Sequence, residues 1–349
     1  MSGIQAIVLD LDGTLLDSSK SISPRNYRAV KQCFEAGIHI IVATARPPRV
    51  AKHFIKDLPF AEYLVFYNGA LVTNESKQVQ RHICIPTEIS QQIIKLIELS
   101  EPHSTIYYEV NDSWYTCTPI PDSESAKFDA RSGESRPEVV DSNFICSLSP
   151  TKILVVGYSS WNELARQFGN QVNVIATDEG VLVQIMHKSA SKEDAVQWVL
   201  NEIGMSPDHV MVFGDDFNDL GLFHKCGFPI AMGNGITELK NCAKYVTESN
   251  DNDGVAAALE KFVLNQVNNE ERGIVSKEGE NIRETNEIIT VNVYKTSPDR
   301  KEVLERQAGE KVEKAREEAL TKIRERYEQR KQSERRRPAS GGELEDDDR

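Results

Sequence analysis

The sequence feature that most constrains the fold is a set of short apolar runs that lead straight into polar residues. AIVL at residues 6–9 is followed at once by Asp10, and HIIVA at residues 39–43 is followed by Thr44. Such runs are typical of buried parallel strands that end in a functional turn. Between them, an amphipathic stretch from Pro24 to Ala36 predicts a helix. The three segments together predict a βαβ unit.

The same alternation of strand and helix continues and then returns later in the chain. Further strands are predicted for YLVFYN, HVMVFG and PIAMG, and further helices for residues 48–56, for residues 193–203 and after Asn218. This alternation predicts an α/β fold with a Rossmann-like, doubly wound parallel sheet. We expect residues 1–82 and 187–263 to form this core.

The middle third of the chain has a different pattern of predicted strands and helices. It contains a helical pattern at residues 88–99, the aromatic strand TIYYEV, the strand TKILVVGY and two alternating runs within residues 172–186. The two alternating runs predict a β-hairpin. Residues 83–186 are therefore predicted to form a separate α+β module that is inserted into the core.

The last segment, residues 264–349, is strongly charged. Apolar residues between Leu304 and Tyr327 recur at spacings of three and four, which is a helical pattern, but bulky ones are sparse and Gly309 interrupts them. A solvated single helix is favoured over a coiled-coil helix that binds a protein partner. We expect this tail to be helical in part and disordered at its end.

Charge and composition limit the partners of the protein. The 349 residues include 54 acidic and 41 basic side chains, and the formal charge of −13 disfavours nucleic acid because like charges repel. The six cysteines show no CxxC spacing, so reduced thiols are expected rather than disulfides or a zinc site. No apolar stretch approaches the ~20 residues that span a bilayer, and no targeting segment is recognisable. We expect a cytoplasmic protein with no membrane partner.

Asp10 and Asp12 are the first candidates for chemistry. Side chains two positions apart at a strand end point the same way, so both carboxylates can face the crevice where open α/β sheets bind ligands. Gly13 lets the backbone turn sharply beside a ligand. One carboxylate could attack phosphorus while the other exchanges a proton with the leaving group and with water. A DxDG turn alone is weak support, because Asp and Gly are ordinary loop residues.

Thr44 and Lys192 are candidates for contacts to a phosphate. Thr44 ends the second strand, so its hydroxyl can reach the same crevice, although it could instead cap the following turn. Lys192 lies in SKED, where Ser191 and Asp194 form a predicted helix-capping pair, so the ammonium and the helix N-terminus would both face an anion. The alternative for Lys192 is an exposed helix lysine.

The segment GDDFND is more informative, because a buried strand runs directly into Asp215, Asp216, Asn218 and Asp219. Magnesium takes oxygen ligands, usually one or two carboxylates with phosphate and water, so Asp215 beside Asp10 would suit it. Asp216 is expected to be exposed. These groups could instead cap a helix or bind calcium, but the EF-hand spacing is absent.

Taken in order, DLDGT, the Thr44 strand, SKED and GDDFND resemble the four motifs of the haloacid dehalogenase superfamily of phosphatases. The stretch to about Phe262, roughly three quarters of the chain, resembles the Cof-type branch, including YNGA, AMGN and NDNDGVAAALE. The resemblance implies a magnesium-dependent phosphatase. Its substrate would be a small phosphorylated metabolite, a sugar phosphate or a phosphorylated cofactor, hydrolysed through an aspartyl-phosphate intermediate.

The resemblance also implies a role for each matching residue. Asp10 would be the nucleophile and Asp12 the general acid and base. The phosphate contacts would be Leu11, Thr44, Ala45, Lys192 and Asn218. The Mg²⁺ ligands would be Asp10, the main-chain carbonyl of Asp12 and Asp215, with Asp219 assisting them or lying behind them. Residues 83–186 would form an α/β cap that excludes water and selects the substrate.

Several alternatives stay open. ATAR stands where the family more usually has ATGR, and Arg46 could bind substrate or brace the loop. His187, near the hinge, is interpreted as structural rather than catalytic. A phosphomutase would share the same core, whereas a dehalogenase would not need Asp12. From another class, the chain could be an interaction or scaffold protein with a weak or vestigial phosphatase core and a partner-binding tail.

Overall fold

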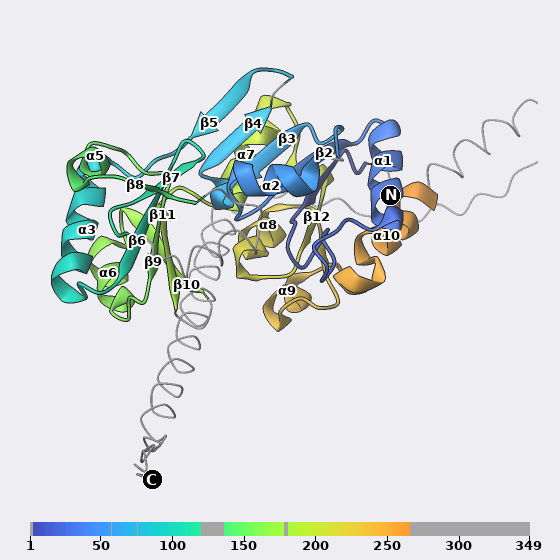
Figure 1. Ribbon diagram of the computed structural model, residues 1–349. Coiled ribbons are helices and arrows are strands. Elements are labelled where there is room, and N and C mark those ends of the chain that lie inside the picture. Colours follow the sequence, from blue (N-terminus) through green and yellow to red (C-terminus); the bar gives the residue numbers. More distant parts are fainter. Residues whose placement is uncertain (1–2, 57, 75, 120–135, 178–180, 266–349) are drawn as a thin grey trace, which may run out of the picture.

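The computed structural model describes residues 3–56, 58–74, 76–119, 136–177 and 181–265 (Figure 1). These residues form two β-sheets with helices packed on them. The larger sheet has the strand order β14-β13-β12-β1-β2-β3-β4-β5, and the smaller sheet has the order β10-β11-β9-β6-β7-β8. Figure 1 shows the smaller sheet and its helices on the left and the larger sheet on the right.

The larger sheet is mainly parallel. Its parallel strands are β1 (Ala6–Leu9), β2 (His39–Ala43), β3 (Tyr63–Phe66), β12 (Val210–Gly214), β13 (Phe228–Ala231) and β14 (Tyr245–Val246). Its antiparallel strands are β4 (Leu71–Asn74) and β5 (Val79–His82), a hairpin added at the β3 edge. The α/β fold with a parallel core sheet is therefore confirmed, and the antiparallel edge was not predicted.

Helices cover both faces of this sheet, because side chains along a strand point alternately to either side. One face carries α1 (Pro24–Glu35), α2 (Pro48–Ile55) and α10 (Gly254–Leu259). The other face carries α7 (Lys192–Glu202), α8 (Leu220–Lys225) and α9 (Thr237–Cys242). In β1, Ile7 and Leu9 pack toward the first group, whereas Ala6 and Val8 pack toward the second. The core is thus doubly wound.

The smaller sheet has helices on one face. Its strands are β6 (Thr105–Val110), β7 (Ser113–Thr116), β8 (Glu138–Val139), β9 (Lys152–Val156), β10 (Val172–Thr177) and β11 (Leu182–His187). Its helices are α3 (Thr87–Ser100), α5 (Ser142–Cys146) and α6 (Trp161–Phe168). Ile93 of α3 and Trp161 of α6 share one buried cluster with Ile153 of β9. The segment between the two halves of the core therefore has a hydrophobic core of its own.

Short helical turns join these elements. They are η1 (Tyr67–Gly69), η3 (Pro207–His209), η4 (Phe217–Asp219), η5 (Asn250–Asn252) and the π-helical η6 (Glu260–Leu264). Leu264 is only 8% exposed and packs into the core cluster, so the core ends after this residue rather than before it. The predicted charged tail, with its helix and its protein partner, otherwise falls on residues 266–349, outside the described residues.

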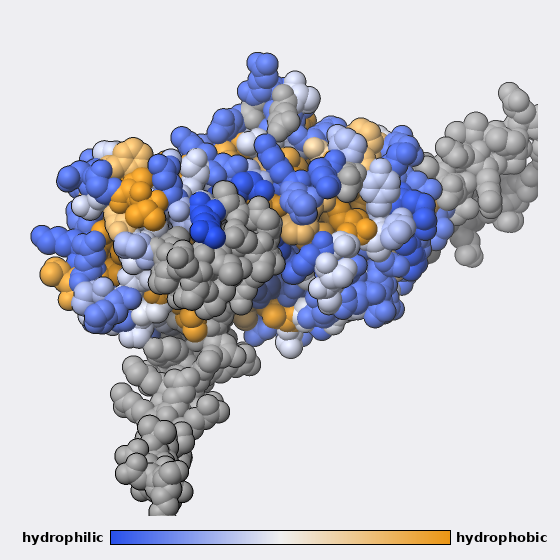
Figure 2. All heavy atoms as spheres, viewed as in Figure 1, coloured by the Kyte–Doolittle hydropathy of each residue, from blue (hydrophilic) through white to orange (hydrophobic). Residues whose placement is uncertain are grey.

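The face of the molecule shown in Figure 2 is mostly hydrophilic where its residues are described. In Figure 2, hydrophilic side chains cover most of the visible face and surround smaller hydrophobic areas. All six cysteines are free thiols, as predicted. Within the described ranges, no helix combines the length and the apolar character needed to cross a membrane.

Candidate active site

Three strands of the larger sheet end at one place, and each is followed by a candidate residue. Asp10 follows β1, Thr44 follows β2 and Asp215 follows β12. β1 pairs in parallel with both neighbours, and the N–H of Asp10 donates to the carbonyl oxygen of Phe213 at 3.4 Å. The carboxyl ends of parallel strands meet at one edge, so the fold brings the three candidates together.

Lys192 is buried between two carboxylates. Its Nζ lies 2.5 Å from Asp10 Oδ1 and 2.8 Å from Asp219 Oδ1, and the lysine side chain is fully buried. The predicted helix-capping pair is present at the start of α7, where the Ser191 hydroxyl accepts a hydrogen bond from the Asp194 N–H. Lys192 is therefore a buried counter-ion rather than an exposed helix lysine. Burial would lower the pKa of Lys192, but the charges of Asp10 and Asp219 raise it.

The negative charge in this buried region exceeds what one lysine can balance. Asp10, Asp215 and Asp219 offer oxygen atoms that all lie within 4.8 Å of one another. Burial raises the pKa of Asp10 well above its usual value, against the opposing charge of Lys192. Burial, together with the charge of Asp219, raises the pKa of Asp215 to about 7. Carboxylates that repel one another in this way suit a divalent cation, because Mg²⁺ prefers oxygen ligands.

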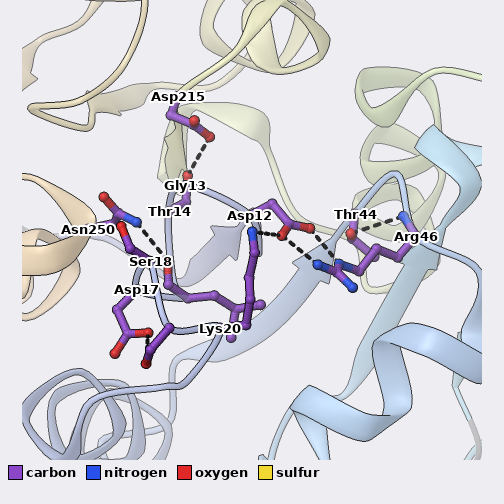
Figure 3. A network of polar contacts seen from close by, with 12 residues as sticks. Asp12, Gly13, Thr14, Asp17, Ser18, Lys20, Thr44, Arg46, Asp215 and Asn250 are labelled. Carbon is purple, nitrogen blue, oxygen red and sulfur yellow. Dashed lines mark hydrogen bonds and ion pairs between the residues drawn. The ribbon is translucent and has the colours of Figure 1, made fainter. Parts of the chain in front are cut away.

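The three carboxylates do not play equal parts. Asp219 uses both of its oxygens: Oδ1 accepts from Lys192, and Oδ2 accepts from the N–H groups of Asp215 and Asp216 at 3.2 and 3.4 Å. Asp215 instead receives a hydrogen bond at Oδ1 from Thr14 Oγ1 at 3.1 Å (Figure 3). Asp219 therefore braces the loop, while Asp10 and Asp215 are better placed as metal ligands.

Asp12 has the opposite electrostatic environment. Arg46 approaches it with Nε 2.5 Å from Oδ2 and with a second nitrogen 2.7 Å from Oδ1, while Lys20 Nζ lies 2.7 Å from Oδ1 (Figure 3). Burial alone would raise the pKa of Asp12, but the hydrogen bonds and charges of Arg46 and Lys20 lower it to about 2. Of the two options for Arg46, this structure shows it bracing Asp12.

The remaining predicted residues lie around the same space. Thr44 is 1% exposed, and its hydroxyl accepts a hydrogen bond from the Arg46 N–H at 3.1 Å. Ala45 lines the same cavity as Thr44, and Asn218 lines it with its side-chain amide 3.0 Å from Asn68 Oδ1. Leu11 is fully buried in the core, so a contact from Leu11 to a phosphate would have to come from its backbone.

A cavity of about 590 Å³ lies here, and its floor is formed by the candidate residues Asp10, Asp12, Thr44, Ala45, Lys192, Asp215 and Asn218. The smaller sheet supplies the opposite wall through β10 and β11, with Asn173, Val174, Ile175, Ala176 and Gln184. Asp216 also lines the cavity and is exposed, as predicted. His187 lies outside this lining, and its Nδ1 accepts from the Ser189 N–H at 3.1 Å, which fits the structural interpretation.

Sequence reasoning missed two contributors to the site. Asn68 lines the cavity from η1, where it has a φ of 52° beside Gly69 with a φ of 101°. The dipeptide Asn-Gly is a signal for this left-handed backbone, but it does not reveal a functional side chain. Lys20, 50% exposed in the turn after Asp17, reaches Asp12 only because the chain folds back on itself.

Comparison with known proteins identifies similar chains. A family model described as haloacid dehalogenase-like hydrolase matches residues 7–259. A putative phosphatase of Haemophilus influenzae is 29% identical over 262 residues, which are 74% of this chain and 97% of the relative. A 5-amino-6-(5-phospho-D-ribitylamino)uracil phosphatase of Bacillus subtilis is 27% identical over 267 residues, 75% of this chain and 96% of the relative.

Solved structures show the same fold. A haloacid dehalogenase-like hydrolase from Bacteroides thetaiotaomicron superposes with a TM-score of 0.65 at 27% identity, covering 74% of this chain and 98% of the other. A protein from Thermotoga maritima superposes with a TM-score of 0.66 at 24% identity, covering 74% of this chain and 97% of the other.

Proposed function

The chain belongs to the haloacid dehalogenase-like hydrolases and is a phosphoric monoester hydrolase, and we propose that it is a Mg²⁺-dependent phosphatase of a small phosphorylated metabolite. The observation that carries the proposal is the convergence of Asp10, Lys192 and Asp215 on the floor of a cavity that Asp12 also lines. Three separate segments of the chain contribute these groups: the turn after β1, the start of α7 and the end of β12.

Asp10 is the proposed nucleophile. Its carboxylate oxygen would attack phosphorus and the bond from phosphorus to the leaving oxygen would break, leaving an aspartyl-phosphate on Asp10. Asp12 would give its proton to the leaving oxygen. In the second step Asp12 would take a proton from water, whose oxygen attacks the same phosphorus and releases inorganic phosphate and free Asp10. Asp10 is 5% exposed, so water would reach it through the cavity.

Asp12 cannot donate a proton while it is held as the structure shows. With its pKa lowered to about 2 by Arg46 and Lys20, the carboxyl is ionised at neutral pH. We therefore propose that substrate draws these two cations toward its own negative charge and so releases Asp12. This assigns Arg46 and Lys20 a part in substrate binding in addition to the bracing seen at rest.

The other predicted residues would hold the phosphoryl group. The Thr44 hydroxyl, the Asn218 amide and the Lys192 ammonium would donate to its oxygens, and the backbone N–H groups of Leu11 and Ala45 would complete the contacts. Hydrogen bonds between charged partners are about twice as strong as neutral ones. These donors therefore favour a phosphoryl group over a neutral ligand.

The donor set also fits a divalent metal. Asp10, Asp215 and the main-chain carbonyl of Asp12 would hold Mg²⁺, and the crowding that raises the pKa of Asp10 and Asp215 supports this assignment. When bound, Mg²⁺ would supply positive charge to the phosphoryl oxygens. Asp219 would orient Lys192 and the Asp215 backbone rather than bind the metal.

Residues 83–186 would act as a cap that selects the leaving group. Their wall of the cavity combines the apolar residues Val174, Ile175 and Ala176 with the amides of Asn173 and Gln184. A leaving group that has an apolar or planar part beside hydrogen-bonding groups fits this wall better than a simple polyol does. A phosphorylated cofactor or cofactor precursor is therefore our first choice, and a sugar phosphate is the second.

Phosphate release from a panel of phosphorylated metabolites, with Mg²⁺ and with chelator, tests the proposal. We expect Mg²⁺-dependent turnover that Asp10→Asn abolishes, while the control Asp208→Asn, which changes an exposed aspartate outside the cavity, retains it. Turnover that survives Asp10→Asn would refute the covalent mechanism. No turnover from well-folded native protein would favour the scaffold alternative.

A further inference from the structure

A second cavity lies beside the active site. It has a volume of about 490 Å³ and lies between α1, α2 and the turn at residues 17–22. Small-molecule sites typically occupy roughly 300–1,000 Å³, so its size suits a ligand. It shares no lining residue with the catalytic cavity. The second cavity therefore has walls of its own on the core.

Basic side chains converge on this cavity. Lys20 comes from the turn, Arg28 from α1, and His53 and Lys56 from the end of α2, and none of the described lining residues is acidic. Such a gathering is unexpected in a chain of net charge −13. A cation at the C-terminal end of α2 interacts favourably with the helix dipole, which explains Lys56. It does not explain why Lys20 and Arg28 face the same space from other elements.

Two of these cations are not held in a salt bridge with any described residue. Neither Arg28 nor Lys56 forms an ion pair within the part of the chain that the structure describes. Glu260 lies near Arg28, but Arg25 takes both of its carboxylate oxygens, with hydrogen bonds of 3.0 and 2.7 Å. The positive charge at Arg28 and Lys56 is thus available to an incoming anion.

Aromatic side chains in the wall of this cavity indicate what the uncharged part of the ligand is. Tyr27 and Phe54, both partly buried, face the same space. Aromatic faces of this kind pack against planar or apolar groups. We propose that this second cavity binds an anion with two or more negative charges and a planar or apolar part, of which a nucleotide is the model.

The position of this second cavity couples it to the active site. Lys20 lines it and also forms the 2.7 Å ion pair with Asp12. The Arg46 guanidinium lies 4.5 Å from the centre of the Phe54 ring and forms the other ion pair with Asp12. An anion in the cavity would compete with Asp12 for Lys20 and would pack on the ring that supports Arg46. The bound anion is either the far end of the substrate or a separate effector.

Calorimetric titration with α,β-methylene adenosine diphosphate, a non-hydrolysable nucleotide, tests the binding without any need for turnover. In the full chain, Arg28→Ala combined with Lys56→Gln should weaken binding roughly tenfold, since each of these two exposed cations contributes roughly a threefold factor. Lys31→Gln, which removes an exposed cation of α1 outside the cavity, is the matched control and should change nothing. Equal affinity of the native chain and the double variant would overturn the proposal, provided both unfold at the same temperature.

Kinetics then distinguish the two sources of the ligand. The substrate is para-nitrophenyl phosphate, which is too small to fill both cavities. The nucleotide is an effector if it lowers or raises kcat and if this effect is lost in the double variant. A nucleotide that only competes, and competes less well in the double variant, marks the cavity as the site for the far end of the substrate. Competition of equal strength in both proteins means binding at the catalytic cavity alone and overturns the proposal.

Discussion

Replacing Lys192 by methionine should be one of the most damaging changes to stability in the metal-free protein. The lysine Nζ is the buried partner of both Asp10 and Asp219, whose side chains are 7% and 1% exposed. Methionine fills a similar volume but leaves two buried carboxylates without their cation. Breaking a buried pair by removing one partner costs roughly 3–5 kcal/mol. For a folded unit of this size that corresponds to a fall in Tm of roughly 10 °C.

The assay is thermal unfolding of native protein and Lys192→Met in chelator. Lys20→Met is the matched control, because it also removes a lysine from the site. Lys20 pairs with Asp12, but its side chain is 50% exposed. Exposed pairs contribute roughly 0–1 kcal/mol, so this control should shift Tm by no more than a few degrees. The contrast between the two lysines isolates the effect of burial.

Two further measurements separate lost charge balance from lost packing. Adding Asp10→Asn to Lys192→Met removes one of the stranded carboxylates and should recover part of the lost stability. Lowering the pH toward 5 should also reduce the loss, because protonated carboxyls need no counter-ion. A Lys192→Met protein with native Tm in chelator at neutral pH would refute the argument that Lys192 balances this buried charge.

Three other outcomes are expected. Gly13→Ala should lower turnover roughly 100-fold, because Gly13 has a φ of +77° and an added Cβ would overlap the carboxylate of Asp215; steady-state kinetics measure it. The metal-free protein should lose stability as pH rises from about 4 to 7, because the folded state keeps a proton on Asp215, whose pKa is raised to about 7. Urea unfolding at a series of pH values measures this loss, and added Mg²⁺ should make the free energy of unfolding depend less on pH. Arg49→Met should cost roughly 3 kcal/mol, because it strands the buried Glu109, 2.6 Å away; urea unfolding with Lys52→Met as an exposed control tests it.

The core strands and the acidic residues at their ends could be predicted from the sequence for a physical reason. A strand buried on both faces is an uninterrupted apolar run, so β1, β2 and β12 stand out in the chain. Parallel strands then place Asp10, Thr44 and Asp215 at one edge, whatever the rest of the chain does. The local sequence pattern and the geometry of a parallel sheet were together sufficient to predict that these three residues lie close together.

Contacts between distant segments could not be predicted in the same way. The ion pair of Arg49 with Glu109 joins α2 to β6, and Tyr67 donates a second hydrogen bond to Glu109 at 3.0 Å. Nothing local in either segment indicates the partner, because the pairing depends on how the smaller sheet packs against the core. Lys20 and Asn68 were not predicted as site residues for the same reason. The hairpin of β4 and β5 was not predicted because the segment between these strands has no Asn-Gly or Asp-Gly turn to indicate it.

The two aspartates that we propose as catalytic have environments opposite to the ones that the proposed reaction needs. A nucleophile must be ionised and an acid protonated, yet burial raises the pKa of Asp10, while Arg46 and Lys20 lower the pKa of Asp12 to about 2. A cation held by Asp10 and Asp215 would favour the ionised form of Asp10. A substrate phosphate that attracts Arg46 and Lys20 would let Asp12 accept a proton. On this argument the arrangement in the structure is a resting state, and metal and substrate binding together convert it into the active one.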